Sequence, residues 1–198
     1  LPYLFLSEMW ERFGYYLMIG IFTLYLKDVT NGFAMSEKES ADLYGTFIAL
    51  VFLTPFVGGL IADRYWGYRT SIIIGGILMG TGYFMIGIHN ITMLYIAMTI
   101  IIIGNGFFKP NISTLLGNIY SQNQYLDKKD EGYNIFYMGI NVGAFICNFF
   151  GAALQILLGW KYAFMAAGVG MFIGVMVFVM GTNHYKGFDG KKGVQPND

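Results

Sequence analysis

Two glutamates and an arginine stand at helical spacing near the start of the chain. They are Glu8, Glu11 and Arg12, and Tyr15 follows three residues later. On an α-helix, residues three or four apart share one face, so these side chains would lie together. Arg12 can neutralise one carboxylate, which leaves the second free to bind and release a proton. The spacing therefore predicts a proton-binding group on a single helix face.

This charged stripe lies within an apolar segment. On a helix that faces lipid, each charge near the middle of the bilayer would cost about 2.5 to 3.5 kcal/mol. The stripe is therefore expected to face the protein interior or water. The alternative is a position at the membrane surface, because Glu8 is close to the first residue. We expect the chain to begin within this helix, and residues upstream of it would place the stripe deeper.

A second cation is predicted inside a later apolar segment. Lys109 precedes Pro110, and a proline removes a backbone donor, kinks the helix and frees a carbonyl group nearby. Arg12 and Lys109 are the two basic residues that fall inside predicted membrane spans. Two acids and two bases balance, so we expect one network in which Lys109 is the switchable partner of Glu8 and Glu11. The alternative is that Lys109 reaches toward a membrane interface.

Six apolar segments must position these residues. A bilayer core of about 30 Å requires roughly 20 mainly apolar residues per helix. The segments of this length are residues 3–26, 41–62, 70–88, 91–118, 132–157 and 161–182. The chain is 56% hydrophobic and 12% charged, which is about half the charged fraction of a soluble domain. We therefore predict an all-α membrane protein with a six-transmembrane-helix bundle over residues 1–182.

The basic residues in the connections predict the orientation of the bundle. Seven lie in the second and fourth connections and the tail, and three lie in the odd-numbered connections. They are Arg64, Arg69, Lys128, Lys129, Lys186, Lys191 and Lys192, against Lys27, Lys38 and Lys161. Cytoplasmic loops carry an excess of lysine and arginine. The even-numbered loops and residues 183–198, a polar linker or tail, are therefore expected in the cytoplasm.

Overall charge and cysteine content exclude several other classes of protein. Twelve basic and twelve acidic residues leave no net charge, so no nucleic-acid partner is expected. The one cysteine, Cys147, allows neither a disulfide within the chain nor a multi-cysteine metal site. We predict no metal and no other cofactor.

Smaller features indicate how the helices begin and pack. Ser36, with Glu39 three residues later, predicts a capping box at the start of the second helix. Small residues four apart let helices approach closely in lipid. Such pairs are Gly76 and Gly80, Gly139 and Gly143, and Gly170 and Gly174. Asparagines recur every seven residues at positions 134, 141 and 148, which is typical of either a helix contact or a wet cavity.

Four motifs together resemble one family of transporters. They are Glu8-Met9-Trp10-Glu11-Arg12-Phe13-Gly14-Tyr15-Tyr16, Gly58 to Arg64 with Gly67 and Arg69, Phe107 to Ser113, and Tyr133 to Phe145. In order and in helix number they resemble the signatures of the proton-dependent oligopeptide transporter family, a branch of the major facilitator superfamily. The resemblance covers essentially the whole chain, and four motifs in register make it specific.

This resemblance implies a fold and a function. The family fold has twelve helices in two bundles, each built from 3+3 inverted repeats, and this chain would be the N-terminal half. The implied activity is proton-coupled symport of di- and tripeptides across the cytoplasmic (inner) membrane by alternating access. Protons would be the coupling ion. The implied partners are the peptide, the lipid bilayer and the C-terminal six-helix bundle of the same protein.

The resemblance also implies roles for particular residues. Those for proton coupling are Glu8, Glu11, Arg12 and Lys109; those for substrate binding are Tyr15, Tyr16, Lys109, Asn141 and Phe52; those of the cytoplasmic gating motif are Asp63, Arg64, Gly67 and Arg69. Two positions depart from the family's pattern. Many members have an arginine at the position of Ile19 and a tyrosine at that of Phe52. Losing a carboxylate partner and a hydroxyl could redirect substrate preference.

Other functions stay open on the sequence alone. A member of the same family could carry nitrate or modified peptides, and an isolated bundle could be a membrane scaffold. Intramembrane proteolysis would need a nucleophile with a general base or a pair of mid-span aspartates. His89 lies in a predicted loop, His184 lies at the end of a span, and no aspartate falls mid-span. We therefore do not expect an enzyme.

Overall fold

The computed structural model describes residues 1–189 of the chain, and these residues form helices and connections without a strand. The six long helices are α1 (Pro2–Lys27), α2 (Glu37–Ile61), α3 (Tyr68–Ile86), α4 (Ile91–Tyr120), α5 (Lys129–Leu158) and α6 (Trp160–Met180). Each predicted span coincides with one of them. The all-α fold and the six-helix arrangement predicted from the sequence are therefore confirmed.

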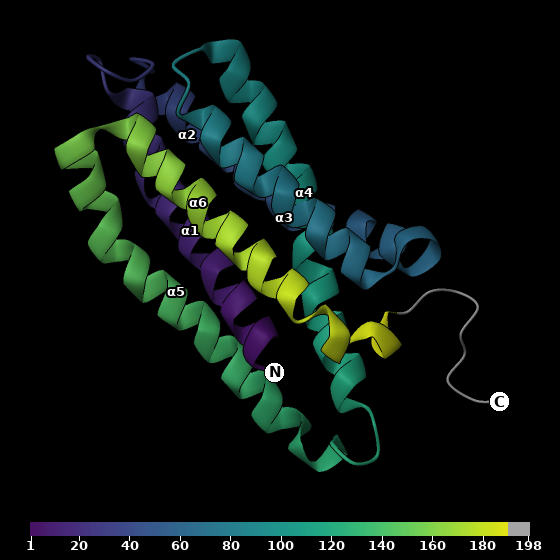
Figure 1. The fold of residues 1–198 in the computed structure, drawn as a ribbon. Coiled ribbons are helices and arrows are strands. Elements are labelled where there is room, and N and C mark those ends of the chain that lie inside the picture. The colour runs from purple at the N-terminus through teal and green to yellow at the C-terminus, as the bar shows by residue number, and fades with distance from the viewer. Residues whose placement is uncertain (190–198) are drawn as a thin grey trace.

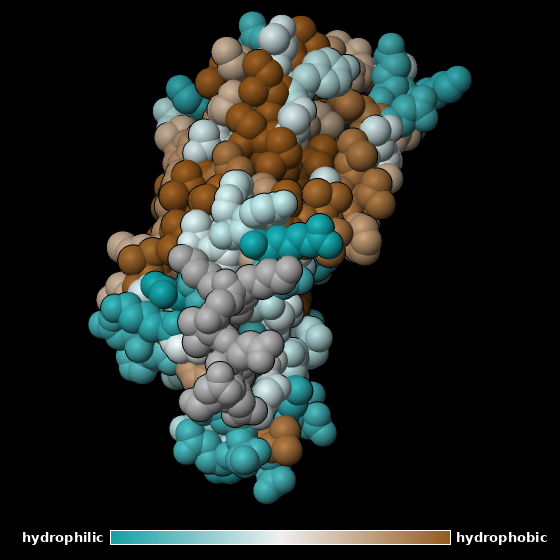
Figure 2. Space-filling view, turned by 90° about the vertical axis from the view of Figure 1, so that its right-hand side faces the viewer, coloured by the Kyte–Doolittle hydropathy of each residue, from teal (hydrophilic) through white to brown (hydrophobic). Residues whose placement is uncertain are grey.

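Five of these helices are long and apolar enough to cross a membrane by their own composition. The exception is α1, which has a sufficient length of 26 residues but contains the charged stripe. Figure 2 shows hydrophobic surface over the middle of one face and hydrophilic surface gathered toward both ends. This distribution is that of a protein that lies across a bilayer. The chain is therefore a multi-pass membrane protein whose first helix packs mainly against α5 and α6.

The connections divide between two ends of the bundle (Figure 1). The odd-loop end holds the α1–α2, α3–α4 and α5–α6 connections, and the even-loop end holds the α2–α3 and α4–α5 connections. The N-terminus and the segment after α6 also lie at the even-loop end. That segment contains two short 3₁₀ helices, Thr182–His184 and Lys186–Phe188. The rest of the predicted tail, with Lys191 and Lys192, lies outside the described residues.

Local sequence signals explain several helix boundaries. The predicted capping box is present, because the Ser36 hydroxyl accepts from the Glu39 amide at 3.2 Å and the Glu39 carboxylate accepts from the Ser36 amide at 2.9 Å. At the odd-loop end, Asp28 accepts from the Trp160 indole at 2.7 Å and from the Thr30 amide at 2.8 Å. The Trp160 hydrogen bond and those of the backbone hold the pKa of Asp28 below its usual value.

Helix α1 is the centre of the packing. It runs along both α5 and α6, α3 runs along α4 and α6, and α2 runs along α4 (Figure 1). Glycines make the closest approaches possible. A Cβ atom at Gly143 of α5 would overlap the Met9 carbonyl oxygen of α1 and would lie 3.0 Å from the Arg12 Cβ. The small-residue pair predicted at 139 and 143 therefore seats α5 directly on the charged part of α1.

Helices α2 and α4 meet around a carbonyl group that Pro110 leaves without its helical partner. Pro110 lies within the continuous helix α4 and has no N–H to bond the Gly106 carbonyl, four residues earlier. A Cβ at Gly58 of α2 would overlap that carbonyl group. Nearby, the Thr54 hydroxyl donates to the Ile102 carbonyl at 3.0 Å. The backbones of α2 and α4 therefore touch at the level of the predicted kink.

We expect a methyl group at Gly58 to destabilise the bundle. Gly58→Ala should lower the free energy of unfolding by about 1–3 kcal/mol, because the new atom meets rigid backbone. Gly45→Ala on the same helix is the matched control, since nothing lies within 4 Å of its Cβ position. That change should be neutral or stabilising by up to about 1 kcal/mol. Thermal unfolding of the purified protein in detergent compares the two, and equal midpoints would refute the close approach.

Candidate functional site

The glutamates and arginine of α1 form a buried cluster. The Arg12 Nε donates to the Glu8 Oε1 at 2.8 Å and lies 2.7 Å from the Glu11 Oε2. Only 2% of Glu8, 0% of Glu11 and 4% of Arg12 are exposed. The stripe therefore faces the protein interior, as expected. Helices α5 and α6 cover α1 and exclude solvent from these charges.

The two carboxylates of this cluster are not equally compensated. The Nε atom carries one hydrogen, and its hydrogen bond goes to Glu8. The contact with Glu11 is an ion pair without hydrogen-bond geometry, and both Glu11 oxygens lack a hydrogen-bond partner within residues 1–189. A buried carboxylate in this position is costly as an anion. Proton uptake or a further donor would remove that cost, so Glu11 is the group best suited to change its charge.

Lys109 of α4 faces the same interior from the opposite side. It is half-buried and interacts electrostatically with Arg12, Glu11 and Glu8. No carboxylate within residues 1–189 lies closer than 4.0 Å to it. Its Nζ instead lies 5.0 Å from the centre of the Phe52 ring of α2, within the range of a cation–π contact. Lys109 therefore interacts with the α1 cluster electrostatically but forms no ion pair with it among the described residues.

Aromatic and amide side chains surround this charged group. The Arg12 guanidinium lies 5.7 Å from the centre of the Tyr15 ring, and the Tyr15 and Tyr16 rings meet edge to face at 5.6 Å. Tyr15 is buried, Tyr16 is partly exposed and Phe52 is 67% exposed. Asn141 of α5 is exposed and donates to the carbonyl of Tyr137, one turn earlier, at 3.3 Å. The predicted substrate positions thus border an open face, although no direct contact joins Asn141 to the charges.

The predicted gating motif lies at the even-loop end, apart from this group. Asp63 and Arg64 are exposed on a π-helical turn, Ala62–Trp66, that continues α2. Gly67 has φ +77°, a backbone conformation that suits glycine. It is the N-cap residue of α3, and it has no side chain of its own with which to cap the helix. The first residues of the motif therefore form a sharp corner between α2 and α3.

Asp189 caps that corner from the segment after α6. Its Oδ1 accepts from the Arg69 amide at 2.7 Å, and its carbonyl accepts from the Tyr68 amide at 3.2 Å. Its Oδ2 lies 3.9 Å from Arg69 Nη1. A carboxylate at this place satisfies orphan amides and faces the positive end of the α3 dipole. The sequence did not reveal this cap, because Asp189 is 120 residues away from the helix that it caps.

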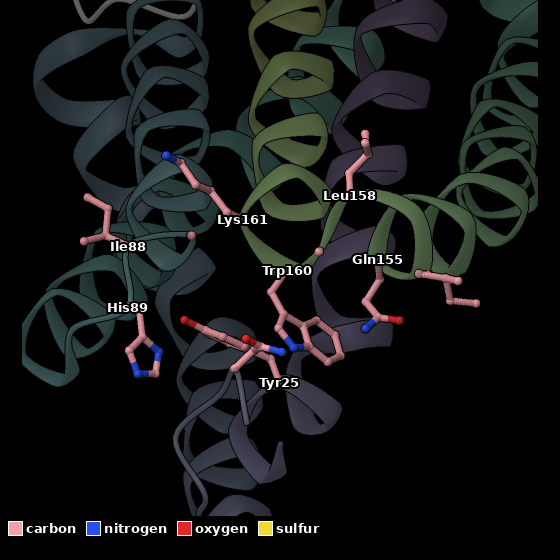
Figure 3. A pocket seen from close by; sticks show the side chains of 11 residues that line it. Tyr25, Ile88, His89, Gln155, Leu158, Trp160 and Lys161 are labelled. Atoms are coloured by element: carbon pink, nitrogen blue, oxygen red, sulfur yellow. The ribbon is translucent and has the colours of Figure 1, made fainter. Parts of the chain in front are cut away.

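A pocket at the odd-loop end of the bundle does not coincide with the charged cluster. It has a volume of about 700 Å³ and lies at the odd-loop end, between α1, the α3–α4 connection and the α5–α6 corner. Figure 3 shows Trp160 beside Tyr25, with His89 and Gln155 on either side. The Trp160 indole is bonded to Asp28, and His89 stacks on Phe33 at 5.0 Å. Both side chains are thus held by neighbouring residues, and the clustered charges favour the α1 cluster as the functional site.

Two further features concern metals and missed residues. Within residues 1–189 no group of three or more potential metal ligands is close enough to hold an ion.

Tyr83 of α3 is fully buried and interacts electrostatically with Glu11, Tyr15 and Arg12. The sequence analysis did not select it. Its signal in the sequence was weak, because Tyr83 and Thr81 are the two polar residues among the apolar residues and glycines of 72–88.

Apolar helices that enclose a buried acid–base cluster define a multi-pass α-helical membrane protein. The sequence model described as PTR2, POT family, matches residues 69–197. This chain therefore belongs to the POT family, as the four motifs indicated.

Named relatives and solved structures agree with this assignment. The chain is 32% identical over 196 residues to an uncharacterized transporter, YclF, of Bacillus subtilis, covering 98% of this chain and 39% of the relative. It is 34% identical over 179 residues to dipeptide and tripeptide permease A of Edwardsiella piscicida, covering 89% of this chain and 36% of the permease. The chain thus spans less than two fifths of the length of these relatives.

The fold comparison extends over nearly the whole chain. A crystal structure of a mutant peptide transporter POT in complex with alafosfalin matches with a TM-score of 0.89 at 33% identity, over 98% of this chain and 41% of that one. A POT family transporter in complex with a thioalcohol conjugated peptide matches with a TM-score of 0.88 at 30% identity, over 94% and 38%. The six-helix bundle is therefore a part of the POT transporter fold.

We expect the Asp189 cap to stabilise the corner between α2 and α3. Asp189→Ala should lower the free energy of unfolding by about 0.5–2 kcal/mol, because α3 loses its capping oxygen. Asp189→Asn is the control: it keeps an acceptor but loses the negative charge, and with it the long, partly exposed ion pair and the interaction with the α3 dipole, each worth about 0–1 kcal/mol. Thermal unfolding should therefore place the Asn variant between wild type and Ala. If the Ala variant unfolds with the wild type, the cap contributes nothing.

Proposed function

We propose that this chain is part of a proton-coupled symporter of di- and tripeptides. The observation that carries the proposal is Glu11, a carboxylate that is fully buried beside Glu8 and Arg12 and has no hydrogen bond within residues 1–189. Such a carboxylate can bind or release a proton when the charges of the neighbouring groups change. The names of the relatives, dipeptide and tripeptide permeases among them, support peptides as the substrate class.

The charge balance of the cluster suggests how proton and peptide would be coupled. With Glu8 and Glu11 both ionised, Arg12 compensates one charge and Lys109 is needed for the other. A proton on Glu11 removes one negative charge, so Lys109 is no longer needed to compensate it. Its ammonium, which within residues 1–189 has a cation–π contact with Phe52 and no ion pair, can then bind the carboxylate of a peptide. Loss of the proton would draw Lys109 back and weaken its hold on the peptide.

The aromatic and amide residues would complete the substrate site. Tyr15, Tyr16 and Phe52 offer rings and hydroxyls beside the charged cluster, and Asn141 offers an amide on the open face of α5. The site would be closed by a second six-helix bundle of the same protein, and the two bundles would rock about it to give alternating access. We further propose that residues 183–198 link the two bundles in the cytoplasm.

The same residues support a location and an orientation. The excess of basic residues at the even-loop end favours the cytoplasmic side of the inner membrane for that end. The gating motif of Asp63, Arg64, Gly67 and Arg69 would then face the cytoplasm, where the corner between α2 and α3 can move against the second bundle. The proposed activity is transport and not catalysis, and protons are its only proposed coupling ion.

A second candidate is transport of another solute by the same mechanism. The observation behind it is the apolar surface that Ile19 and Phe52 present where many family members have an arginine and a tyrosine. Ile19 is partly exposed and Phe52 is exposed, so both can reach a substrate. Such a surface would favour solutes with an apolar part, such as modified peptides, and is less suited to nitrate. Competition among dipeptides, tripeptides, modified peptides and nitrate separates the two candidates.

We expect Glu11→Gln to abolish proton-driven uptake while sparing exchange. The amide cannot carry a proton in and out of the site, but it keeps the shape and neutrality of the protonated acid. The full-length protein in liposomes should therefore lose accumulation of a labelled dipeptide under an inward proton gradient, and should still exchange dipeptide at equal pH. Glu37→Gln is the matched control, since its side chain is 91% exposed. Gradient-driven accumulation by the Glu11 variant would refute the proposal.

A further inference from the structure

Tyr83 of α3 carries a buried hydroxyl that no described residue satisfies. The residue is 0% exposed, and its hydroxyl lacks a hydrogen-bond partner within residues 1–189. A buried tyrosine hydroxyl normally finds a partner, because leaving it unpaired costs free energy. Tyrosine also has a same-sized apolar alternative in phenylalanine, so packing alone does not require the hydroxyl. Its presence therefore points to a polar partner in some state of the protein.

The position of the ring indicates which group that partner is. A Cβ atom at Gly14 of α1 would lie 3.3 Å from the Tyr83 Cε2, so the ring edge next to the hydroxyl rests against Gly14. Gly14 is three residues after Glu11, which places both on the same side of α1. Glu11 is also the strongest electrostatic neighbour of Tyr83, ahead of Tyr15 and Arg12. Two buried polar groups that have no hydrogen-bond partner within residues 1–189, an acid and a hydroxyl, thus lie on adjoining parts of α1 and α3.

We propose that the Tyr83 hydroxyl is the hydrogen-bond donor that holds the Glu11 carboxylate when it is ionised. Tyr83 would act as a positioning residue for the proton site, and the inference rests on the proposed role of Glu11. The hydroxyl donates to the anion and stabilises it relative to the protonated acid. Proton release from Glu11 then does not depend on Lys109 alone.

The other groups around Glu11 are less suited to this task. On α1, Glu8 repels it, Arg12 donates to Glu8 and makes no hydrogen bond to Glu11, and the Tyr15 ring lies against Arg12. On α4, Lys109 is drawn toward Phe52 and is the proposed peptide partner. Tyr83 is neutral, belongs to a third helix and is kept in place by its contact with Gly14. It can therefore stay with Glu11 while the cations rearrange.

The test is the pH profile of Tyr83→Phe in the full-length protein. Without the donor, ionised Glu11 is less stabilised, so the site should keep its proton to higher pH. The alkaline limb of proton-driven dipeptide uptake should move to higher pH by about one unit, the equivalent of one hydrogen bond to a charged group. A role in packing alone would change the amount of folded protein, to which uptake is normalised, and would leave this limb in place.

Tyr25→Phe is the matched control. Tyr25 is also a buried tyrosine, and it lies on α1 itself, about 20 Å along the helix from Glu11. The Tyr25 ring packs against the rings of Phe33, Trp160 and Phe164 at the odd-loop end. The pH profile of uptake by Tyr25→Phe should therefore match that of the wild type. An unchanged limb in Tyr83→Phe, or an equal shift in both variants, would overturn the inference.

A second comparison uses Glu11→Gln as the background. If Tyr83 acts through Glu11, then adding Tyr83→Phe should leave the pH profile of dipeptide exchange unchanged in that background. A new shift there would mean that the hydroxyl acts on another group, and the inference would fail. If the Glu11 variant still accumulates dipeptide under a gradient, the proposed function of Glu11 fails first. Loss of that accumulation without any shift in Tyr83→Phe defeats the Tyr83 inference alone.

Discussion

The burial of Glu8, Glu11 and Arg12 in the middle of α1 constrains the rest of the bundle. Removing one partner from a buried charge cluster costs several kcal/mol, and lipid cannot replace it. Helix α1 must therefore be covered by other helices, and α5 and α6 lie along it. The helices can lie this close because glycines occupy the positions where they cross, as at Gly143 against Arg12. The small residues of the neighbouring helices thus allow the close packing that buries the charges of α1.

This arrangement leaves the interior open on one side. Helices α2 and α5 are the least buried of the apolar spans, and both carry exposed aromatic residues such as Phe52 and Phe145. Lys109 of α4 lies beside Phe52 of α2. The cluster is therefore sealed by α5 and α6 on its outer side, while its one adjustable cation lies beside an exposed ring. The proposed proton-binding group and the proposed surface for a solute are therefore adjacent but distinct.

Local patterns predicted more of the molecule than long-range contacts did. The six helices, the Ser36 capping box and the shared face of Glu8, Glu11 and Arg12 follow from spacing within a few residues, and each is present. Tyr83 beside Gly14, Asp189 on α3 and Gly58 on α4 join segments that are 69, 120 and 48 residues apart in the sequence. No periodicity encodes which helices become neighbours. Lys109 shows the same limit, since its interior position was predictable but its contact with Phe52 was not.

The two cations of the site differ in whether their distance from the carboxylates can change. This difference links the charge balance to the relative position of two helices. Arg12 is on the same helix as both carboxylates, so its distance to them hardly changes when helices move. Lys109 is on α4, which has few contacts with α1, and its attraction to Glu11 acts across that gap. In the proposed function, protonation of Glu11 would therefore change the force between two helices and not the structure of one. A charge network confined to α1 would bind protons without moving a helix, whereas one that extends to α4 would couple proton binding to a displacement of α4 relative to α1.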